Sequence, residues 1–271
     1  MALEDAGPRV RTRPLEHGGR RAVRSAAPAA VDWHDYAQTY DVLVGLNPAY
    51  RALVAEYERF VEGLWLEQGD VVVEIGAGTG NFSLAAAATA PGCHVRHIDA
   101  SAAMNAQARR KALRLGLSNV SFVTADVHAA DVPTGSAALV TAVHALYAIP
   151  NPLGVIAAMH RWLAPGGMVF ACDPGQAVDV GGWRRYILGS AAREHGVVRA
   201  AWLLWRLRGA ARQNRRIAAT LERGAYWRHD AAEFRAAFED AGFIIRDVRP
   251  TFRGASDLLI AEKPLGARRS R

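Results

Sequence analysis

The sequence predicts an α/β fold in which a doubly wound sheet of seven strands is mostly parallel and carries helices on both faces. Between residues 70 and 174, short β-branched segments alternate with helical ones, and this order implies crossover connections within a parallel sheet. Residues 244–263 read instead as two strands whose connection is too short for a helix, which predicts an antiparallel edge strand. Residues 181–228 show only helical patterns and predict a helical lid beside the sheet.

A helix is expected before the first strand. Asn47 and Pro48 are typical of a helix start, because the asparagine side chain caps the helix and proline lacks the N–H that would stay unpaired. Apolar residues then recur at spacings of three and four, which indicates an amphipathic helix: Tyr50, Leu53, Val54, Tyr57, Phe60, Val61 and Leu64. Gly69 is expected to end this helix.

The alternating elements follow in order. Strands are expected at 70–76, 94–100, 120–126, 137–146 and 168–174. The helices between them are expected at 81–90, at 102–115 and at 151–163. After the lid, residues 230–243 predict a last helix that buries Phe234 and Phe238 on one face and has Gly242 as its C-cap.

The net charge of +7 is unevenly distributed along the chain. Residues 1–30 carry +3 and residues 263–271 carry +4, and we expect both to be disordered basic tails. Residues 181–230 hold eleven arginines against three acidic residues, a net of +8 that the acidic remainder of the body balances. This arginine-rich segment fits either a solvated helix face or a grip on an anionic substrate. Because the charge lies mainly in tails, a nucleic-acid partner is not expected.

Composition also bears on the compartment. No apolar run reaches the ~18–20 residues of a membrane helix, and the first residues lack the apolar core of a signal peptide. Cys93 and Cys172 are too few for a disulfide framework. A cytoplasmic protein is therefore expected, with a possible homodimer and no predicted metal site.

The loop that follows the first strand is the most informative motif. Gly76-Ala77-Gly78-Thr79-Gly80 opens a helix whose free N–H groups and bare backbone suit a closely held ligand. The dinucleotide-binding pattern requires Gly or Ala three positions after the second glycine, and Asn81 stands there. The form E-x-G-x-G-x-G, beginning at Glu74, instead resembles the first motif of class I S-adenosylmethionine-dependent methyltransferases of the small-molecule type. The resemblance extends over about residues 33–262.

This resemblance implies a Rossmann-like sheet and a set of residues that bind S-adenosyl-L-methionine. Glu74 and the three glycines would lie beneath the methionine part, and Asp99 would accept hydrogen bonds from the ribose hydroxyls. Residues 100–104, "ASAAM", match the motif that follows in the family. The implied cofactor contacts are Tyr40, Glu74, Gly76, Gly78, Gly80, Asp99, Ala100, Met104, Asp126 and Val127. Met104 would wall the adenine, while Asp126 and the Val127 N–H would bond to the ring.

The resemblance also implies a domain organisation. Residues 31–262 would form the methyltransferase domain, with lid helices at 31–68 and a helical substrate lid inserted at 181–228. Within the first lid segment, Tyr36 or Tyr40 is expected over the transferred methyl group, because electron-rich rings favour a sulfonium. The alternative is that Trp33 and Tyr40 anchor this helix to the body of the protein.

The catalytic residues are expected after the fourth and fifth strands, because ligands of such sheets lie at the carboxyl ends of the strands. Candidates there are His144, Tyr147, Asp173 and Gln176. The Asn/Asp-Pro-Pro-Tyr motif of amino-methylating enzymes is absent from "TAVHALYAIPNP". His144 is the candidate general base, with a packing role as the alternative. Tyr147 would orient the acceptor or simply close the pocket.

Three functions remain open at this point. The first is methyl transfer to a small-molecule acceptor, in natural-product or other secondary metabolism, at carbon, nitrogen or oxygen. The second is a non-methylating use of the same cofactor, such as cyclisation or aminobutyryl chemistry that releases methylthioadenosine. The third is RNA or acidic-membrane binding through the basic, tryptophan-containing segment.

Overall fold

The computed structural model describes residues 31–175 and 179–266, and its centre is a seven-stranded sheet in the order β3-β2-β1-β4-β5-β7-β6. The strands are β1 (Val71–Ile75), β2 (His94–Asp99), β3 (Val120–Thr124), β4 (Ala137–Val143), β5 (Leu163–Asp173), β6 (Ile244–Thr251) and β7 (Ser256–Glu262). The first five pair in parallel, while β7 pairs antiparallel with both β5 and the edge strand β6. The predicted mostly parallel sheet with an antiparallel edge is confirmed.

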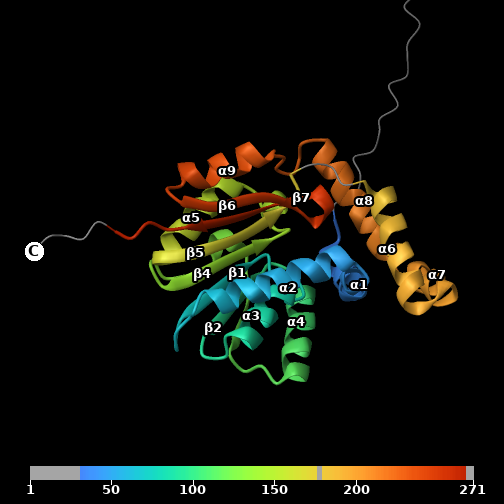
Figure 1. The fold of residues 1–271 in the computed structure, drawn as a ribbon, viewed down its shortest axis with the longest axis horizontal. Coiled ribbons are helices and arrows are strands. Elements are labelled where there is room, and N and C mark those ends of the chain that lie inside the picture. Colours follow the sequence, from blue (N-terminus) through green and yellow to red (C-terminus); the bar gives the residue numbers. More distant parts are fainter. Residues whose placement is uncertain (1–30, 176–178, 267–271) are drawn as a thin grey trace, which may run out of the picture.

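Helices cover both faces of the sheet (Figure 1). One face carries α2 (Pro48–Gly63), α3 (Asn81–Thr89) and α4 (Ala102–Leu115), and the other carries α5 (Pro152–Trp162) and α9 (Ala231–Asp240). Alternate residues of β1 face opposite layers: Val72 packs with α2 and α3, whereas Val73 and Ile75 pack with α5 and α9. Burial on both faces explains why β1 is a continuous apolar run in the sequence.

Several helix ends follow the expected local chemistry. Asn47 caps α2, since its Oδ1 accepts a hydrogen bond from the Ala49 N–H at 3.1 Å. The helix ends at Gly63 rather than at Gly69, because the chain turns at Trp65, with a φ of 50°, before it enters β1. Asp230 and Glu233 form a capping box at the start of α9.

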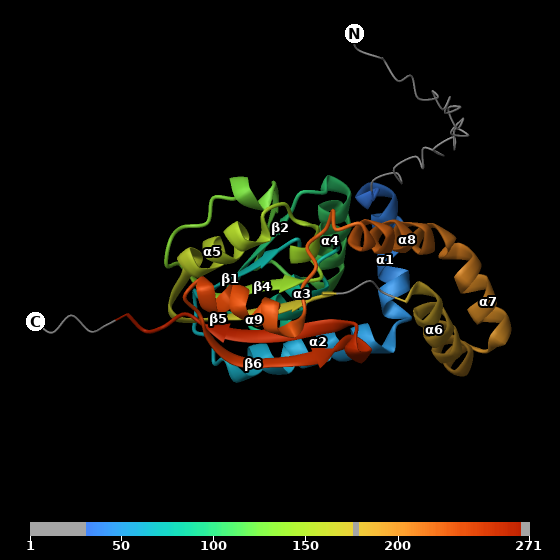
Figure 2. The ribbon, with the colours of Figure 1, turned by 90° about the horizontal axis from the view of Figure 1, so that it is seen from above.

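Four helices form a second layer beyond the sheet, which Figures 1 and 2 show as an arc at one end of the molecule. They are α1 (Trp33–Gly45), α6 (Val180–His195), α7 (Val197–Arg206) and α8 (Arg208–Glu222). We call these four helices the lid. Their small core also takes in Met104 of α4 and consists of Tyr36, Ala37, Leu46, Met104, Ile187, Ala191, Ala200, Leu207 and Ala210.

The described chain begins at the lid helix α1 and ends after β7, at the opposite end of the molecule (Figure 1). The predicted tail 1–30 lies outside the described residues, as do residues 267–271 of the second predicted tail. Lys263 still pairs with the sheet, because its N–H donates to the Gly167 carbonyl at 2.9 Å and its Nζ to the Leu163 carbonyl at 2.7 Å. Among residues 31–175 and 179–266, no helix has the length and apolar character needed to cross a membrane.

Candidate functional site

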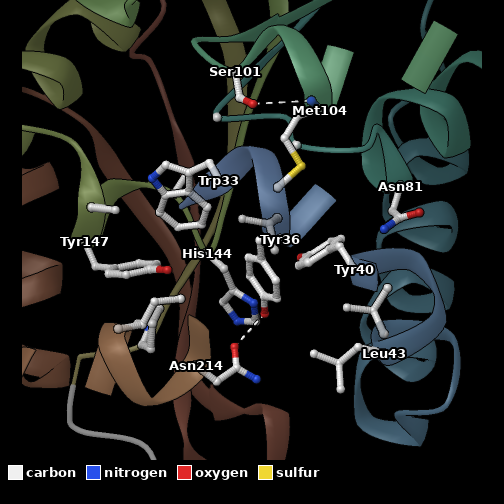
Figure 3. A pocket seen from close by; sticks show the side chains of 18 of the residues that line it. Trp33, Tyr36, Tyr40, Leu43, Asn81, Ser101, Met104, His144, Tyr147 and Asn214 are labelled. Carbon is white, nitrogen blue, oxygen red and sulfur yellow. Dashed lines mark hydrogen bonds between the residues drawn. The ribbon is translucent and has the colours of Figure 1, made fainter. Parts of the chain in front are cut away.

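A pocket of about 550 Å³ lies between the carboxyl ends of the strands and the lid. The glycine loop and the ends of β2, β3 and β4 supply one side of it, and α1, α6 and α8 supply the other. Figure 3 shows side chains from these two sides converging on a common space. All the predicted cofactor residues except Gly80 line this pocket, and so do the catalytic candidates His144 and Tyr147.

The three glycines of the loop have different reasons to be glycine. All have positive φ values, 56° at Gly76, 56° at Gly78 and 83° at Gly80, a region that side chains disfavour. A Cβ at Gly76 would lie 2.6 Å from the Cβ of Ala145, so packing within the protein excludes it. A Cβ at Gly78 would meet no protein atom within 4 Å. Gly78 is therefore the position whose bare backbone faces the open pocket.

Glu74 lies next to the last residue of β1, before this loop, and is almost wholly buried. Its Oε2 accepts a hydrogen bond from the Ser83 N–H at 2.6 Å, at the start of α3. Burial raises the pKa of Glu74 to about 8, although the hydrogen bonds from Ser83 oppose the shift. The carboxyl group is therefore mostly protonated at neutral pH and would ionise when a cation binds beside it.

Asp99 ends β2 and connects two segments of the pocket wall. Its Oδ2 accepts from the Gly78 N–H and its Oδ1 from the Ser101 N–H, both at 2.7 Å. Burial raises the pKa of Asp99, and these two N–H groups oppose that shift. Each oxygen keeps a lone pair for a ligand hydroxyl, since a carboxylate accepts about four hydrogen bonds. The carboxylate is thus held rigidly next to the bare backbone of Gly78.

A further group of residues lines the pocket beyond Asp99. Ser101 caps α4 and accepts from the Met104 N–H, which places the buried thioether of Met104 on the wall (Figure 3). Asp126 is exposed and caps a short 3₁₀ turn, where its Oδ1 accepts from the His128 N–H at 2.8 Å. The buried Val127 follows it, and Ala100 lines the pocket beside Asp99.

His144 lies where the chain leaves β4, with a φ of 49° that is rare for a residue with a side chain. The strand therefore ends at Val143, earlier than the predicted residue 146, because the chain turns here into a 3₁₀ turn. The His144 Nε2 lies 3.0 Å from the Ser256 Oγ, and the ring packs edge-on against Phe252. Burial lowers the pKa of His144 to about 4, so the imidazole is neutral at physiological pH.

Tyr147 enters the pocket from the turn after His144 (Figure 3). Its ring packs edge-on against Tyr226, with 5.4 Å between the centroids, and burial raises the pKa of its phenol well above the usual range. The phenol therefore stays protonated and can donate a hydrogen bond to a ligand. The structure brings His144 and Tyr147 to one wall of the pocket, as predicted, whereas their chemical roles stay predictions.

Aromatic residues of α1 form the wall opposite the glycine loop. Tyr40 packs edge-on against both Tyr36 and Tyr50, with centroid separations of 5.1 and 6.3 Å. The Tyr36 hydroxyl donates to the Asn214 Oδ1 of α8 at 2.6 Å, a bond drawn in Figure 3. This bond joins two lid helices that lie far apart in the sequence.

Sequence reasoning missed a polar contact between α1 and the glycine loop. The Asp41 Oδ1 accepts from the Lys111 Nζ at 2.9 Å and from the Thr79 Oγ1 at 2.6 Å. Lys111 also donates to the Asn81 Oδ1 at 2.6 Å. Because these residues are 30 to 70 positions apart, no local pattern in the sequence indicated the contact.

Asp173 does not face the pocket, so the prediction that it would contact the transferred group is wrong. Its side chain is fully buried, and its Oδ2 lies 3.9 Å from the His229 Nε2. His229 stacks on Phe234 of α9, so Asp173 points towards the α9 face of the sheet. Gln176, predicted beside it, lies outside the described residues. In the described part of the chain, no group of three or more His, Cys, Asp or Glu is placed to hold a metal ion.

Three arginines of the lid also line the pocket: Arg184 of α6, and Arg208 and Arg215 of α8. The sequence indicated the excess of arginine in this segment but did not distinguish these three from their neighbours. None of them has an ion-pair partner in the described part of the chain. The pocket thus has carboxyl groups on its sheet side and guanidinium groups on its lid side.

Comparisons with known proteins identify similar chains. Residues 49–248 match the family described as a methyltransferase domain. The ubiquinone biosynthesis O-methyltransferase of Pseudomonas aeruginosa (strain UCBPP-PA14) is 36% identical over 112 residues, which are 39% of this chain and 47% of that protein. That of Pseudomonas paraeruginosa (strain DSM 24068 / PA7) is 35% identical over the same shares. The match thus spans about half the length of these curated relatives.

Two solved structures show the same fold. A SAM-dependent methyltransferase from Aquifex aeolicus gives a TM-score of 0.52 at 16% identity, covering 76% of this chain and 88% of that chain. A geranyl diphosphate methyltransferase in complex with GPP and sinefungin gives 0.55 at 19% identity, covering 79% and 78%. At such identities the likeness concerns the fold.

Proposed function

The chain belongs to the methyltransferase-domain family, and we propose that it is an S-adenosylmethionine-dependent enzyme that methylates a small-molecule acceptor. The observation that carries the proposal is the arrangement around Asp99. Its carboxylate is fixed by the N–H groups of Gly78 and Ser101, next to backbone that no side chain covers. This combination suits a nucleoside whose ribose hydroxyls need acceptors and whose chain passes close to a loop.

The charges on this side of the pocket also fit that cofactor. S-adenosylmethionine, when bound, supplies an electrophilic methyl group on a positively charged sulfur. Glu74, Asp99 and Asp126 are the acidic residues of the described chain that line the pocket. Opposite charges attract most strongly at the buried Glu74 and the half-buried Asp99, where the effective dielectric is lower than at the exposed Asp126. Glu74 and the glycine loop would hold the amino-acid end, Asp99 the ribose, and Met104, Asp126 and Val127 the adenine. Tyr40 would supply an aromatic face near the cation.

The protein must also orient the acceptor and exclude water. The buried phenol of Tyr147 is placed to donate a hydrogen bond to it, and the aromatic wall of α1 shields the centre of the pocket. Neutral His144 is available to accept a proton, since burial lowers its pKa to about 4. Such a base suits an acceptor that is already acidic or that loses its proton easily. His144 is therefore proposed as the base and Tyr147 as the orienting donor.

The acceptor is proposed to be a small metabolite of a biosynthetic pathway. The pocket, at about 550 Å³, lies in the size range of small-molecule sites, and much of its lining is aromatic or aliphatic. The name of the Pseudomonas relatives supports an oxygen nucleophile, although that match spans only 112 residues. The cytoplasmic location and the possible homodimer expected from the sequence remain part of this proposal.

Calorimetry and product analysis test the proposal. The purified chain should bind S-adenosylmethionine, and a screen of small acceptors should yield adenosylhomocysteine with the methylated product. Release of methylthioadenosine instead would establish the non-methylating use of the same cofactor. If the folded chain bound neither S-adenosylmethionine nor adenosylhomocysteine, the proposed function would be wrong, whatever the acceptor.

A further inference from the structure

The lid side of the pocket carries arginine side chains that have no role in the proposed binding of the cofactor. We propose that the acceptor carries an anionic group, a carboxylate or a phosphate, and that Arg184, Arg208 and Arg215 bind it. This inference rests on the proposed function and specifies the class of acceptor. These three arginines belong to the lid helices α6 and α8, and none of them lies on the sheet side of the pocket.

The geometry of α8 places Arg208 and Arg215 on the face of the helix that lines the pocket. Residues at spacings of three and four lie on one face of a helix. The pocket-lining residues of α8 and of the position before it follow this spacing closely: Leu207, Arg208, Ala211, Asn214, Arg215, Ile217 and Ala218. Within this face two alanines leave space between the polar groups. Asn214 is fixed by the Tyr36 hydroxyl, so the face has a defined orientation towards α1.

These arginines are available for a ligand. Arg184, Arg208 and Arg215 take part in none of the ion pairs seen in the described residues, which include those of Arg51, Arg235, Arg246 and Arg249. Arg208 lies over the Trp205 ring, with its Cζ 4.3 Å from the centroid, a contact that restrains the side chain and leaves its N–H groups free to donate. Arg184 and Arg215 are exposed at the pocket edge. Guanidinium groups bind carboxylate and phosphate through paired hydrogen bonds.

The distribution of charge gives the acceptor a direction. The carboxylates of Asp99 and Asp126 are on the sheet side, where they favour a cation and repel an anion. An anionic acceptor would therefore place its charged end under the lid and its reacting end towards His144 and Tyr147. The wall between the two ends includes Trp33, Tyr36, Trp183, Ile187 and Leu207. An acid with an aromatic or aliphatic body matches such a wall.

Other arginines of the same helices provide matched controls. Arg212 is on α8, between Arg208 and Arg215, but it does not line the pocket. Arg185 follows Arg184 on α6 and does not line the pocket either. If the arginines formed merely a solvated face, all would respond alike to substitution. If the pocket-lining arginines bind an anion, they alone would affect its affinity.

The test measures binding of small probes to the protein saturated with adenosylhomocysteine. Benzoate, phenyl phosphate and neutral benzamide are compared by calorimetry at low ionic strength. We expect at least one anion to bind about tenfold or more tightly than benzamide. The affinity for that anion should fall about tenfold in the double variant Arg208→Gln/Arg215→Gln, and also about tenfold in the single variant Arg184→Gln. Arg212→Gln and Arg185→Gln should leave its affinity within twofold. The tighter of the two anions identifies carboxylate or phosphate as the recognised group.

The possible failures are separable. Equal affinity for anions and benzamide, or an equal loss in the control variants, would overturn the inference. Adenosylhomocysteine affinity, measured on every variant, should stay unchanged, because the arginines lie away from the carboxyl groups of the sheet side. If the wild type bound adenosylhomocysteine but did not discriminate between probes, only the anionic acceptor would be wrong. If it did not bind adenosylhomocysteine, the proposed function itself would be wrong. Thermal unfolding confirms that each variant is folded.

Discussion

The two sides of the pocket differ in how their polar groups are held. On the sheet side, backbone N–H groups at the strand and helix ends fix the carboxyl groups of Glu74 and Asp99 at 2.6 to 2.7 Å. On the lid side, Arg184 and Arg215 are exposed side chains without ion pairs in the described part of the chain. The first arrangement is rigid before any ligand binds, whereas the second can adapt. One pocket thus combines a preorganised side, where we propose that the cofactor binds, with an adaptable side, where we propose that the acceptor binds.

Among the described residues, α1 makes polar contacts both with the sheet side and with α8. Asp41 connects α1 to Lys111 and to the glycine loop. On its other flank α1 contacts α8, where the Gln213 Nε2 donates to the Asp35 Oδ2 at 2.9 Å and Tyr36 donates to Asn214. A movement of α1 would therefore alter the acceptor side and the cofactor side together.

Replacing Asp99 should have the largest effect, because it removes the central acceptor of the sheet side. For Asp99→Ala we expect the affinity for S-adenosylmethionine to fall about 100-fold or more, since hydrogen bonds to a charged group contribute about 1.5–3 kcal/mol each. Isothermal calorimetry measures the change. Asp99→Asn keeps the shape and one acceptor oxygen, so its loss should be smaller. An unchanged affinity in Asp99→Ala would contradict the assignment of the sheet side.

Substitution of His144 tests whether this residue accepts the proton from the acceptor. For His144→Gln we expect kcat to fall about 10- to 100-fold, with cofactor affinity within a few-fold of the wild type. Because the pKa of His144 is lowered to about 4, wild-type kcat should show no loss from protonation of this group between pH 5.5 and 7.5. If the kcat of His144→Gln stayed within threefold of the wild-type value, His144 would be a packing residue and not the base.

The glycine loop offers a matched pair of variants within the sheet side. Gly76→Ala and Gly78→Ala share a φ of 56°, so each should lose about 1 kcal/mol of stability through backbone strain. Gly76→Ala should lose about 1–3 kcal/mol more, because its Cβ would overlap with Ala145. Gly78→Ala should instead fold well and bind S-adenosylmethionine about tenfold more weakly.

Chemical denaturation and calorimetry on the same two proteins separate these effects. A Gly78→Ala variant that bound the cofactor with wild-type affinity would show that the ligand does not approach this backbone. Equal stability of the two variants would show that the contact with Ala145 relaxes freely. Either outcome would weaken the distinction between a glycine kept for packing and a glycine kept for the ligand.

The sheet side could be predicted from the sequence because local chemistry determines it. Glu74, Gly78 and Asp99 lie at or just after the carboxyl ends of strands whose order is fixed by crossover rules, and the carboxyl ends of parallel strands meet at one edge. The same rules placed Asp126 and His144 on the pocket. They failed for Asp173, since consecutive residues at a strand end point to opposite faces and its side chain turns towards α9.

For the lid side, the sequence predicted the type of structure and the excess of arginine, but not the individual residues that line the pocket. The helical pattern and the excess of arginine were visible, but which arginines line the pocket depends on how α6 and α8 pack against α1. That packing rests on contacts such as Tyr36 with Asn214, 178 positions apart. Short-range periodicity cannot select such partners, so Arg212 and Arg215 look alike in the sequence although only Arg215 lines the pocket.

The smallest predicted effect concerns the response of the sheet side to acid. His97 of β2 is fully buried behind the glycine loop, where its Nδ1 lies 2.7 Å from the Ser83 Oγ, and burial lowers its pKa to about 4. The unfolded chain binds a proton here as the pH falls below about 6.5, but the folded chain does so only near 4. Stability contributed by neutral His97 is therefore present above pH 6.5 and is lost as the pH falls towards 4.

The variant His97→Gln isolates the contribution of His97 to the free energy of unfolding. Glu74 makes an opposite contribution, because its raised pKa removes stability as the pH rises from 4.5 to about 8. The difference in unfolding free energy between wild type and variant should shrink by about 1.4 kcal/mol per pH unit between pH 6 and 4.5, and stay constant above pH 7. Urea unfolding at several pH values measures it. A difference independent of pH would mean that His97 is hydrated in the folded chain. The lid arginines stay charged throughout this range, so acid changes the protonation of the sheet side and leaves the charge of the lid side unchanged.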